Sequence, residues 1–112
     1  DIDFFLRTSP QNARRVVEAL AEFGFAGAFE EADFLDSTRL VQLGNPPNRI
    51  DLMTTISGVD FDSAWAGRVE AKLGEVGVPL IGLPELLINK RASGRSKDLV
   101  DLEVLDASRS KD

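Results

Sequence analysis

The residues best suited to chemistry in this sequence are three aspartates on two segments that are predicted to be strands. Asp1 and Asp3 are two residues apart, so on a strand both carboxylates lie on one face, about 6 to 7 Å apart. Asp51 lies between Ile50 and Leu52 and faces away from both on a strand. If the two strands are neighbours, the carboxylates repel one another unless a divalent cation binds them. The alternative, three solvated aspartates, stays open on spacing alone.

A second candidate group is the basic segment 89–98 near the C-terminus. Its cations are Lys90, Arg91, Arg95 and Lys97, across the predicted end of one helix and the start of the next. Cations near a helix C-terminus and a free helix N-terminus both favour phosphate binding. The alternative is a solvated basic helix end that balances the helix dipole or pairs with the acids that follow.

Composition narrows the chemistry further. The 112 residues contain no Cys, His or Tyr, which excludes disulfides, thiolate nucleophiles and Ser-His-Asp triads within this chain. The oxygen ligands that remain suit a hard cation such as Mg²⁺, which often binds together with substrate phosphates. The absence of Cys fits a reducing compartment, so we expect a cytoplasmic protein.

Charge and length exclude other classes. The formal net charge is -6, which argues against a surface built for broad nucleic-acid binding but leaves room for a local basic patch. No apolar run approaches the ~20 residues that span a bilayer, so no membrane partner is expected. The length fits a single domain over residues 1–112. Because the first residue is Asp, we expect that domain to be N-terminally truncated.

The first half of the sequence predicts the strands that carry the aspartates and the helix between them. Ile2 and Phe4 are expected to face a core, opposite the acids. Ser9 and Pro10 are typical of a helix start, and Gly24 of a helix end. The predicted elements are a strand at 2–6, a helix from Ser9 to Gly24, a short helical turn at 30–35, and an antiparallel hairpin of strands 38–43 and 49–56.

The second half predicts two short strands among helices. Trp65 lies in an apolar helix and is expected in the core. The order of elements indicates an α+β (mixed α/β) fold, with helices on one small mixed sheet. The predicted elements are a helix at 61–69, strands at 70–73 and 76–81, and helices at 83–93 and 97–107.

Taken together, these segments resemble the nucleotidyltransferase superfamily of the DNA polymerase beta type. The resemblance rests on a strand that opens with DIDFFL and a later strand that reads RIDLMT. The C-terminal segment is similar to that of bacterial members, including the minimal and abortive-infection groups, and reads LLINKRASGRSKDLVDLEVL. The resemblance covers nearly the whole chain.

This resemblance implies roles for the three carboxylates. Asp1 and Asp3 match the first carboxylate pair and would bind Mg²⁺. Asp51 matches the third carboxylate, which is a metal ligand or activates the acceptor hydroxyl, and it is the catalytic residue that the resemblance implies. The family reaction moves a nucleoside monophosphate from a nucleoside triphosphate to an acceptor hydroxyl, and pyrophosphate leaves.

The resemblance also implies a nucleotide-binding set. Lys90 matches the helical lysine that neutralises triphosphate charge. Lys97 and Asp98, with Asp101 and the Leu that follows it, match the closing motif, and Arg95 lies beside it. Lys90, Arg95 and Lys97 are therefore the expected nucleotide-binding residues.

One departure from the family pattern concerns the nucleotide. Members carry a Gly-Gly or Gly-Ser turn upstream of the first Asp pair, and this sequence starts at Asp1. The leading interpretation is an enzyme that acts on a hydroxyl of a protein, a tRNA or a small molecule. The alternative is a non-catalytic interaction domain, such as a toxin–antitoxin component, which the missing turn and the acidic charge favour. Exposed strand edges of a small sheet make a homodimer or a cognate partner plausible.

Overall fold

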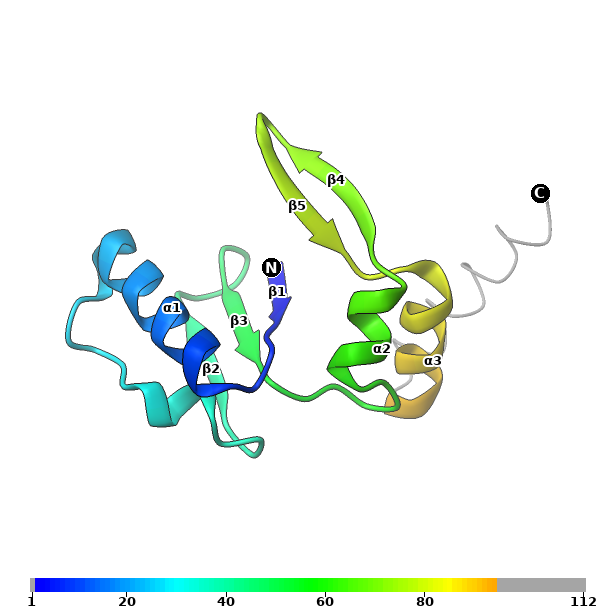
Figure 1. Cartoon of the computed structure of the whole chain (residues 1–112), viewed down its shortest axis with the longest axis horizontal. Helices are drawn as coiled ribbons and strands as arrows, with labels where there is room; N and C mark the ends of the chain where they lie inside the picture. Colours follow the sequence, from blue (N-terminus) through cyan, green and yellow to red (C-terminus); the bar gives the residue numbers. More distant parts are fainter. Residues whose placement is uncertain (1, 95–112) are drawn as a thin grey trace. The chain divides into compact units, whose positions relative to one another are not determined.

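The computed structural model describes residues 2–94 (Figure 1). The chain divides into two compact units, Asp1–Thr55 and Ile56–Asp112, and each is described by itself. Helices and small sheets alternate along the described part, which confirms the predicted α+β fold. The expected single domain over residues 1–112 stays a prediction, and the helix predicted at 97–107 lies outside the described residues.

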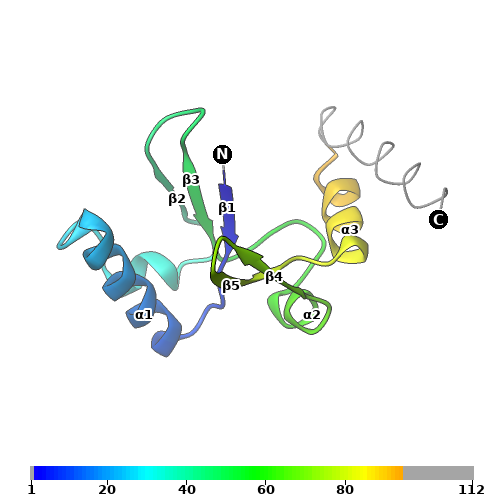
Figure 2. The same ribbon diagram turned by 90° about the horizontal axis from the view of Figure 1, so that it is seen from above.

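The first unit is built on a three-stranded mixed sheet in the order β1-β3-β2 (Figure 2). β1 (Ile2–Phe5) runs parallel to β3 (Ile50–Met53). β2 (Leu40–Leu43) pairs with β3 in the antiparallel sense, as the predicted hairpin requires. The central strand β3 is therefore bonded on both edges, and it holds the first and second strands in one sheet.

Helix α1 (Pro10–Leu20) begins where local sequence patterns predict, but it ends at Leu20 rather than at the predicted Gly24. The Ser9 side chain accepts a hydrogen bond from the Asn12 amide at 3.1 Å, which caps the helix. The chain leaves the helix through a short π-helical turn, η1 (Ala21–Phe25), in which Gly24 has a φ of 114°. Glycine adopts that backbone conformation without the strain that a side chain would add.

The core of the first unit lies on one face of this sheet. Alternate residues of β2 and β3 point to that face, where they meet α1 and the 3₁₀ helix η2 (Glu31–Phe34). Ile2 and Phe4 lie on the core face by register, but they are 43% and 44% exposed because β1 is the edge strand. Their expected place in the core is therefore only partly reached. The buried residues of the cluster are Ala13, Leu20, Phe34, Val41, Leu43 and Leu52.

The second unit contains helix α2 (Phe61–Ala66), a hairpin of β4 (Val69–Leu73) and β5 (Val76–Leu80), and helix α3 (Leu83–Ser93). The hairpin forms its own two-stranded sheet rather than joining the first one, so the expectation of one sheet is wrong. The reason is local, because a two-residue turn with Gly74 at a φ of 67° pairs the strands directly.

A short loop packs closely on α3 in this second unit. Gly58 has a φ of 78°, and a Cβ placed there would lie 2.7 Å from the Ala92 Cβ. The Asn89 side chain donates a hydrogen bond to the Ser57 carbonyl at 3.0 Å. The Asp60 carboxylate caps α2 by accepting from the Ser63 amide at 2.7 Å, and that hydrogen bond lowers the Asp60 pKa.

Trp65 is not a core residue as expected, since 41% of it is exposed. Phe61 stacks against its ring with centroids 6.0 Å apart. The Arg68 guanidinium lies 3.9 Å from the ring centroid and donates to the Trp65 carbonyl at 2.8 Å. A cation over an indole face is a favourable contact that does not need full burial. None of the helices within residues 2–94 combines the length and apolar character that crossing a bilayer requires.

We predict that Leu52→Ala lowers the free energy of unfolding by about 2 to 4 kcal/mol, because it leaves a cavity at the centre of the buried cluster. Urea denaturation followed by far-ultraviolet circular dichroism measures the loss. Leu40→Ala is the matched control, since Leu40 is 52% exposed, and it should cost less than about 1 kcal/mol. Equal losses for the two variants would contradict the core assignment.

We predict that Gly58→Ala destabilises the second unit by about 1 to 3 kcal/mol, through positive-φ strain and the clash with α3. Fluorescence of Trp65, the one tryptophan in the sequence, reports unfolding of this unit. Gly77→Ala is the control, because a Cβ there meets nothing within 4 Å and no positive φ is involved. A Gly58→Ala protein as stable as the control would show that the loop does not pack on α3.

Candidate functional site

Two of the three predicted metal ligands lie side by side in the first unit. The parallel register of β1 and β3 pairs Asp3 with Asp51, so their Cα atoms are about 4.8 Å apart and their side chains share a face. That face is opposite the core, because Leu52 and its neighbours point the other way. The predicted neighbouring strands are confirmed, and the structure brings Asp3 and Asp51 together.

Asp51 is buried, with 7% of its surface exposed. A carboxylate is rarely buried unless a cation or a set of donors compensates it. The compensation comes from Arg49, whose Nε lies 2.9 Å from Oδ1 and whose Nη2 donates to Oδ2 at 3.2 Å. The two residues are two apart in sequence, so their side chains extend from the same side of the strand.

The contact between Arg49 and Asp51 neutralises charge without saturating the carboxylate. Although Nε and Oδ1 are within ion-pair distance, they are not aligned as a hydrogen bond, and Oδ1 is buried with no hydrogen-bond donor. The short distance supports a Coulombic contact, and the missing alignment leaves a lone pair of Oδ1 unused. A buried acceptor without a donor is costly, so this atom is suited to a further ligand.

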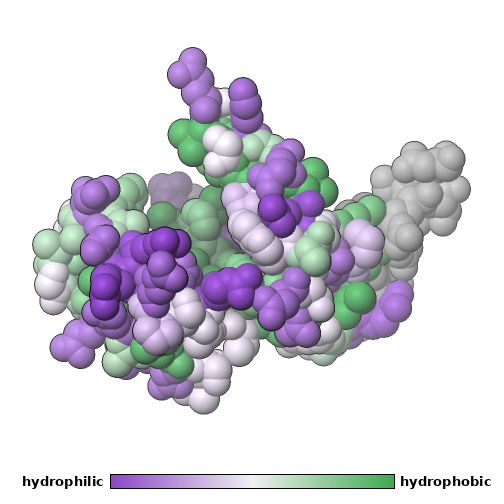
Figure 3. Space-filling view, in the orientation of Figure 1, coloured by the Kyte–Doolittle hydropathy of each residue, from purple (hydrophilic) through white to green (hydrophobic). Residues whose placement is uncertain are grey.

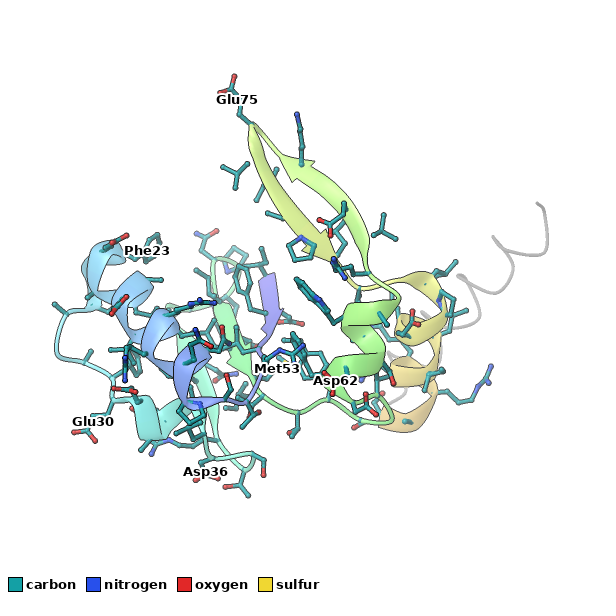
Figure 4. The ribbon with its side chains drawn as sticks, viewed as in Figure 1. Phe23, Glu30, Asp36, Met53, Asp62 and Glu75 are labelled. Atoms are coloured by element: carbon teal, nitrogen blue, oxygen red, sulfur yellow. The ribbon has the colours of Figure 1, made fainter. Side chains whose placement is uncertain are left out.

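The neighbours of Asp51 extend the site across the sheet. Asp3 is exposed, so the pair joins one buried and one accessible carboxylate. Gln42 pairs with Asp51 from β2, which puts an amide in the same row. Met53 lies two residues beyond Asp51 on the same strand, at the end of β3 (Figure 4). Carboxylate and amide oxygens are ligands that hard divalent cations accept.

The full metal-binding set is only partly described. Within residues 2–94 no group of three or more acidic residues is placed to hold a metal ion. Asp1, the third member of the predicted set, lies outside the described residues. The described part of the site is therefore a two-carboxylate pair, and the three-carboxylate cluster stays a prediction.

The predicted nucleotide-binding residues belong to the second half of the chain. Lys90 lies in the last turn of α3, which ends at Gly94 with a φ of 66°, as the sequence predicts. Cations in the last turn interact favourably with the helix dipole, which agrees with the alternative interpretation of this segment. Arg95 and Lys97 lie outside the described residues, and nucleotide binding by all three stays a prediction.

Sequence reasoning missed two members of the site, Arg49 and Gln42. The alternation of side chains along a strand gave a signal for both. Arg49 lies two residues before Asp51 and so falls on the same face, and Gln42 lies between the buried Val41 and Leu43 and so faces away from the core. The residues next to Arg49 and Gln42 in the sequence do not indicate which residue either one contacts. Only the strand register pairs Gln42 with Asp51, and only the side-chain conformation brings Arg49 onto the carboxylate.

No protein-family model, curated protein or solved structure matches this chain. Function is therefore inferred from the carboxylate pair, from the contacts of Asp51, and from the motifs that resemble the nucleotidyltransferases. The geometry by itself shows two carboxylates in register on the face of the first sheet opposite the core.

Proposed function

We propose that this protein is a nucleotidyltransferase that moves a nucleoside monophosphate from a nucleoside triphosphate to an acceptor hydroxyl. The observation that carries the proposal is the pairing of Asp3 with Asp51 on the face opposite the core, with Oδ1 of Asp51 buried and without a donor. The available donors fit Mg²⁺, because they are carboxylate and amide oxygens. We propose Asp1 as a further ligand.

In this proposal the acceptor oxygen forms a bond to the α-phosphorus, and the bond to the bridging oxygen of pyrophosphate breaks. Bound Mg²⁺ would supply charge neutralisation on the triphosphate and the leaving group. Asp51 would act as a ligand or accept the proton of the attacking hydroxyl. Lys90, Arg95 and Lys97 would neutralise the remaining phosphate charge. None of these steps requires the imidazole, thiol or phenol groups that the sequence lacks.

For the acceptor we propose a hydroxyl of a protein, a tRNA or a small molecule. The acidic net charge of -6 disfavours wide contact with a polyanion, so a tRNA would have to bind at a local basic surface such as the segment 89–98. A cytoplasmic location supplies both magnesium and nucleotides and belongs to the same proposal.

A second candidate function is a non-catalytic interaction domain, as in one member of a toxin–antitoxin pair or in a homodimer. The observation that favours it is the apolar face of the β4–β5 hairpin, visible as green side chains below the purple tip (Figure 3). Register places six apolar side chains on that one face. Four are more than half exposed, which is unusual unless the face binds a partner. The four are Val69, Leu73, Val76 and Leu80.

We predict that the protein binds a nucleoside triphosphate only in the presence of Mg²⁺, with a dissociation constant between about 1 μM and 1 mM. Calorimetric titration with ATP, CTP, GTP and UTP, each with excess Mg²⁺ and then with EDTA, checks this. The absence of heat for all four nucleotides with Mg²⁺ would contradict the enzyme proposal and favour the interaction domain.

We predict that Asp51→Asn weakens Mg²⁺ binding at least about tenfold while the fold persists, since the amide is isosteric but lacks the charge that holds a hard cation. Affinity is measured by titration and folding by circular dichroism. Asp36→Asn is the matched control, because Asp36 is an exposed carboxylate of the same unit that accepts from Thr38 (Figure 4). Unchanged Mg²⁺ affinity in Asp51→Asn would remove Asp51 from the site.

A further inference from the structure

Arg49 already places a positive charge beside the Asp51 carboxylate. Its guanidinium contacts both oxygens of the carboxylate, with Nε 2.9 Å from Oδ1 and Nη2 3.2 Å from Oδ2. The Asp51 side chain is 10% exposed and that of Arg49 is 30% exposed. The anion is thus fixed in a largely buried place, while its counter-ion keeps a path to solvent.

The neighbouring carboxylate adds to the negative charge that a counter-ion at Asp51 offsets. Asp3 faces Asp51 in register on the adjacent strand, and like charges directly opposite each other destabilise a sheet. Arg49 offsets the charge of the buried Asp51 directly, beside the exposed Asp3.

The same geometry makes Arg49 a competitor of a metal ion for the Asp51 carboxylate. A divalent cation binds a carboxylate oxygen at about 2.0 to 2.6 Å, and Nε is only 2.9 Å from that oxygen. Two cations beside one carboxylate would repel each other at short range, in a place where solvent screens weakly. The guanidinium and a metal ion would therefore compete for the charge of Asp51.

We propose that Arg49 is the resident counter-ion of Asp51 and that a divalent cation binding at the Asp3–Asp51 pair must compete with it. This proposal rests on the cation site of the proposed function and adds that Arg49 sets the cation affinity of that site. Arg49 acts as a positioning residue that lowers the cation affinity of the free site. When a metal ion weakens this ion pair, the partly exposed guanidinium stays beside the site and could contact an anionic co-ligand.

The test is titration of the full chain with Mn²⁺ alone, followed by the electron paramagnetic resonance signal of free Mn²⁺. We expect Arg49→Gln to bind Mn²⁺ about tenfold more tightly than the unaltered protein, because the competing charge is gone. Arg39→Gln is the matched control. Arg39 pairs with Asp33 at 3.0 Å in the same unit, so the net charge change is equal, and its affinity should stay within about twofold of the unaltered protein.

Thermal unfolding separates this role from a purely structural ion pair. Without metal, we expect Arg49→Gln to have a lower melting temperature than the unaltered protein. Saturating Mn²⁺ should raise the melting temperature of the variant by more than it raises that of the unaltered protein. A structural pair would lower stability without tightening Mn²⁺ binding. If Arg49→Gln does not fold, Arg49→Lys replaces it, since lysine keeps the charge but loses the two-point contact and should bind Mn²⁺ more tightly than the unaltered protein.

Equal or weaker Mn²⁺ binding by the folded variant, or no binding in any variant, overturns the proposal. The outcome is distinct from that of the nucleotide titration. Tighter Mn²⁺ binding by Arg49→Gln with no triphosphate bound supports the counter-ion role and contradicts the enzyme. Magnesium-dependent triphosphate binding with no change in Arg49→Gln supports the enzyme and removes Arg49 from control of the site.

Discussion

Parallel pairing between β1 and β3 is the interaction on which the site depends. The Ile2 amide donates to the Arg49 carbonyl at 3.0 Å, and the Leu6 amide donates to the Met53 carbonyl at 2.8 Å, so the register is held at both ends of the short strand. A slip of one residue would turn every side chain of β1 to the opposite face. The aspartate would then point into the core, where a lone carboxylate is strongly unfavourable.

The two carboxylates that this register brings together differ in environment. Asp51 lies on the central strand and is buried, whereas Asp3 lies on the edge strand and is exposed. The buried acid therefore needs a positive partner, which Arg49 provides, while water stabilises the charge of the exposed acid. In the proposed function, one fixed and one accessible carboxylate would hold a cation and leave coordination positions open to a phosphate.

The second unit combines a closely packed loop with an exposed apolar hairpin. A close approach at Gly58 and the Asn89 hydrogen bond fix a loop on α3, whereas the β4–β5 hairpin turns an apolar face outward. An isolated two-stranded hairpin is only marginally stable in water, so a face of this kind gains most from a covering surface. This feature is the physical basis for the interaction-domain alternative, and it is independent of the carboxylate pair.

Local sequence patterns determined much of the architecture. The Ser9 cap, the Gly94 helix end and the antiparallel β2–β3 hairpin are encoded by neighbouring residues, and alternation alone put Asp3 on the face opposite Ile2 and Phe4. The tertiary structure decided that β1 lies beside β3, that Asp51 is buried and that Arg49 neutralises it. It also left Trp65 half-exposed under Arg68 and kept the β4–β5 hairpin out of the first sheet. These features depend on pairing between segments far apart in the chain, and local preferences carry no information about which distant strand will supply the hydrogen bonds.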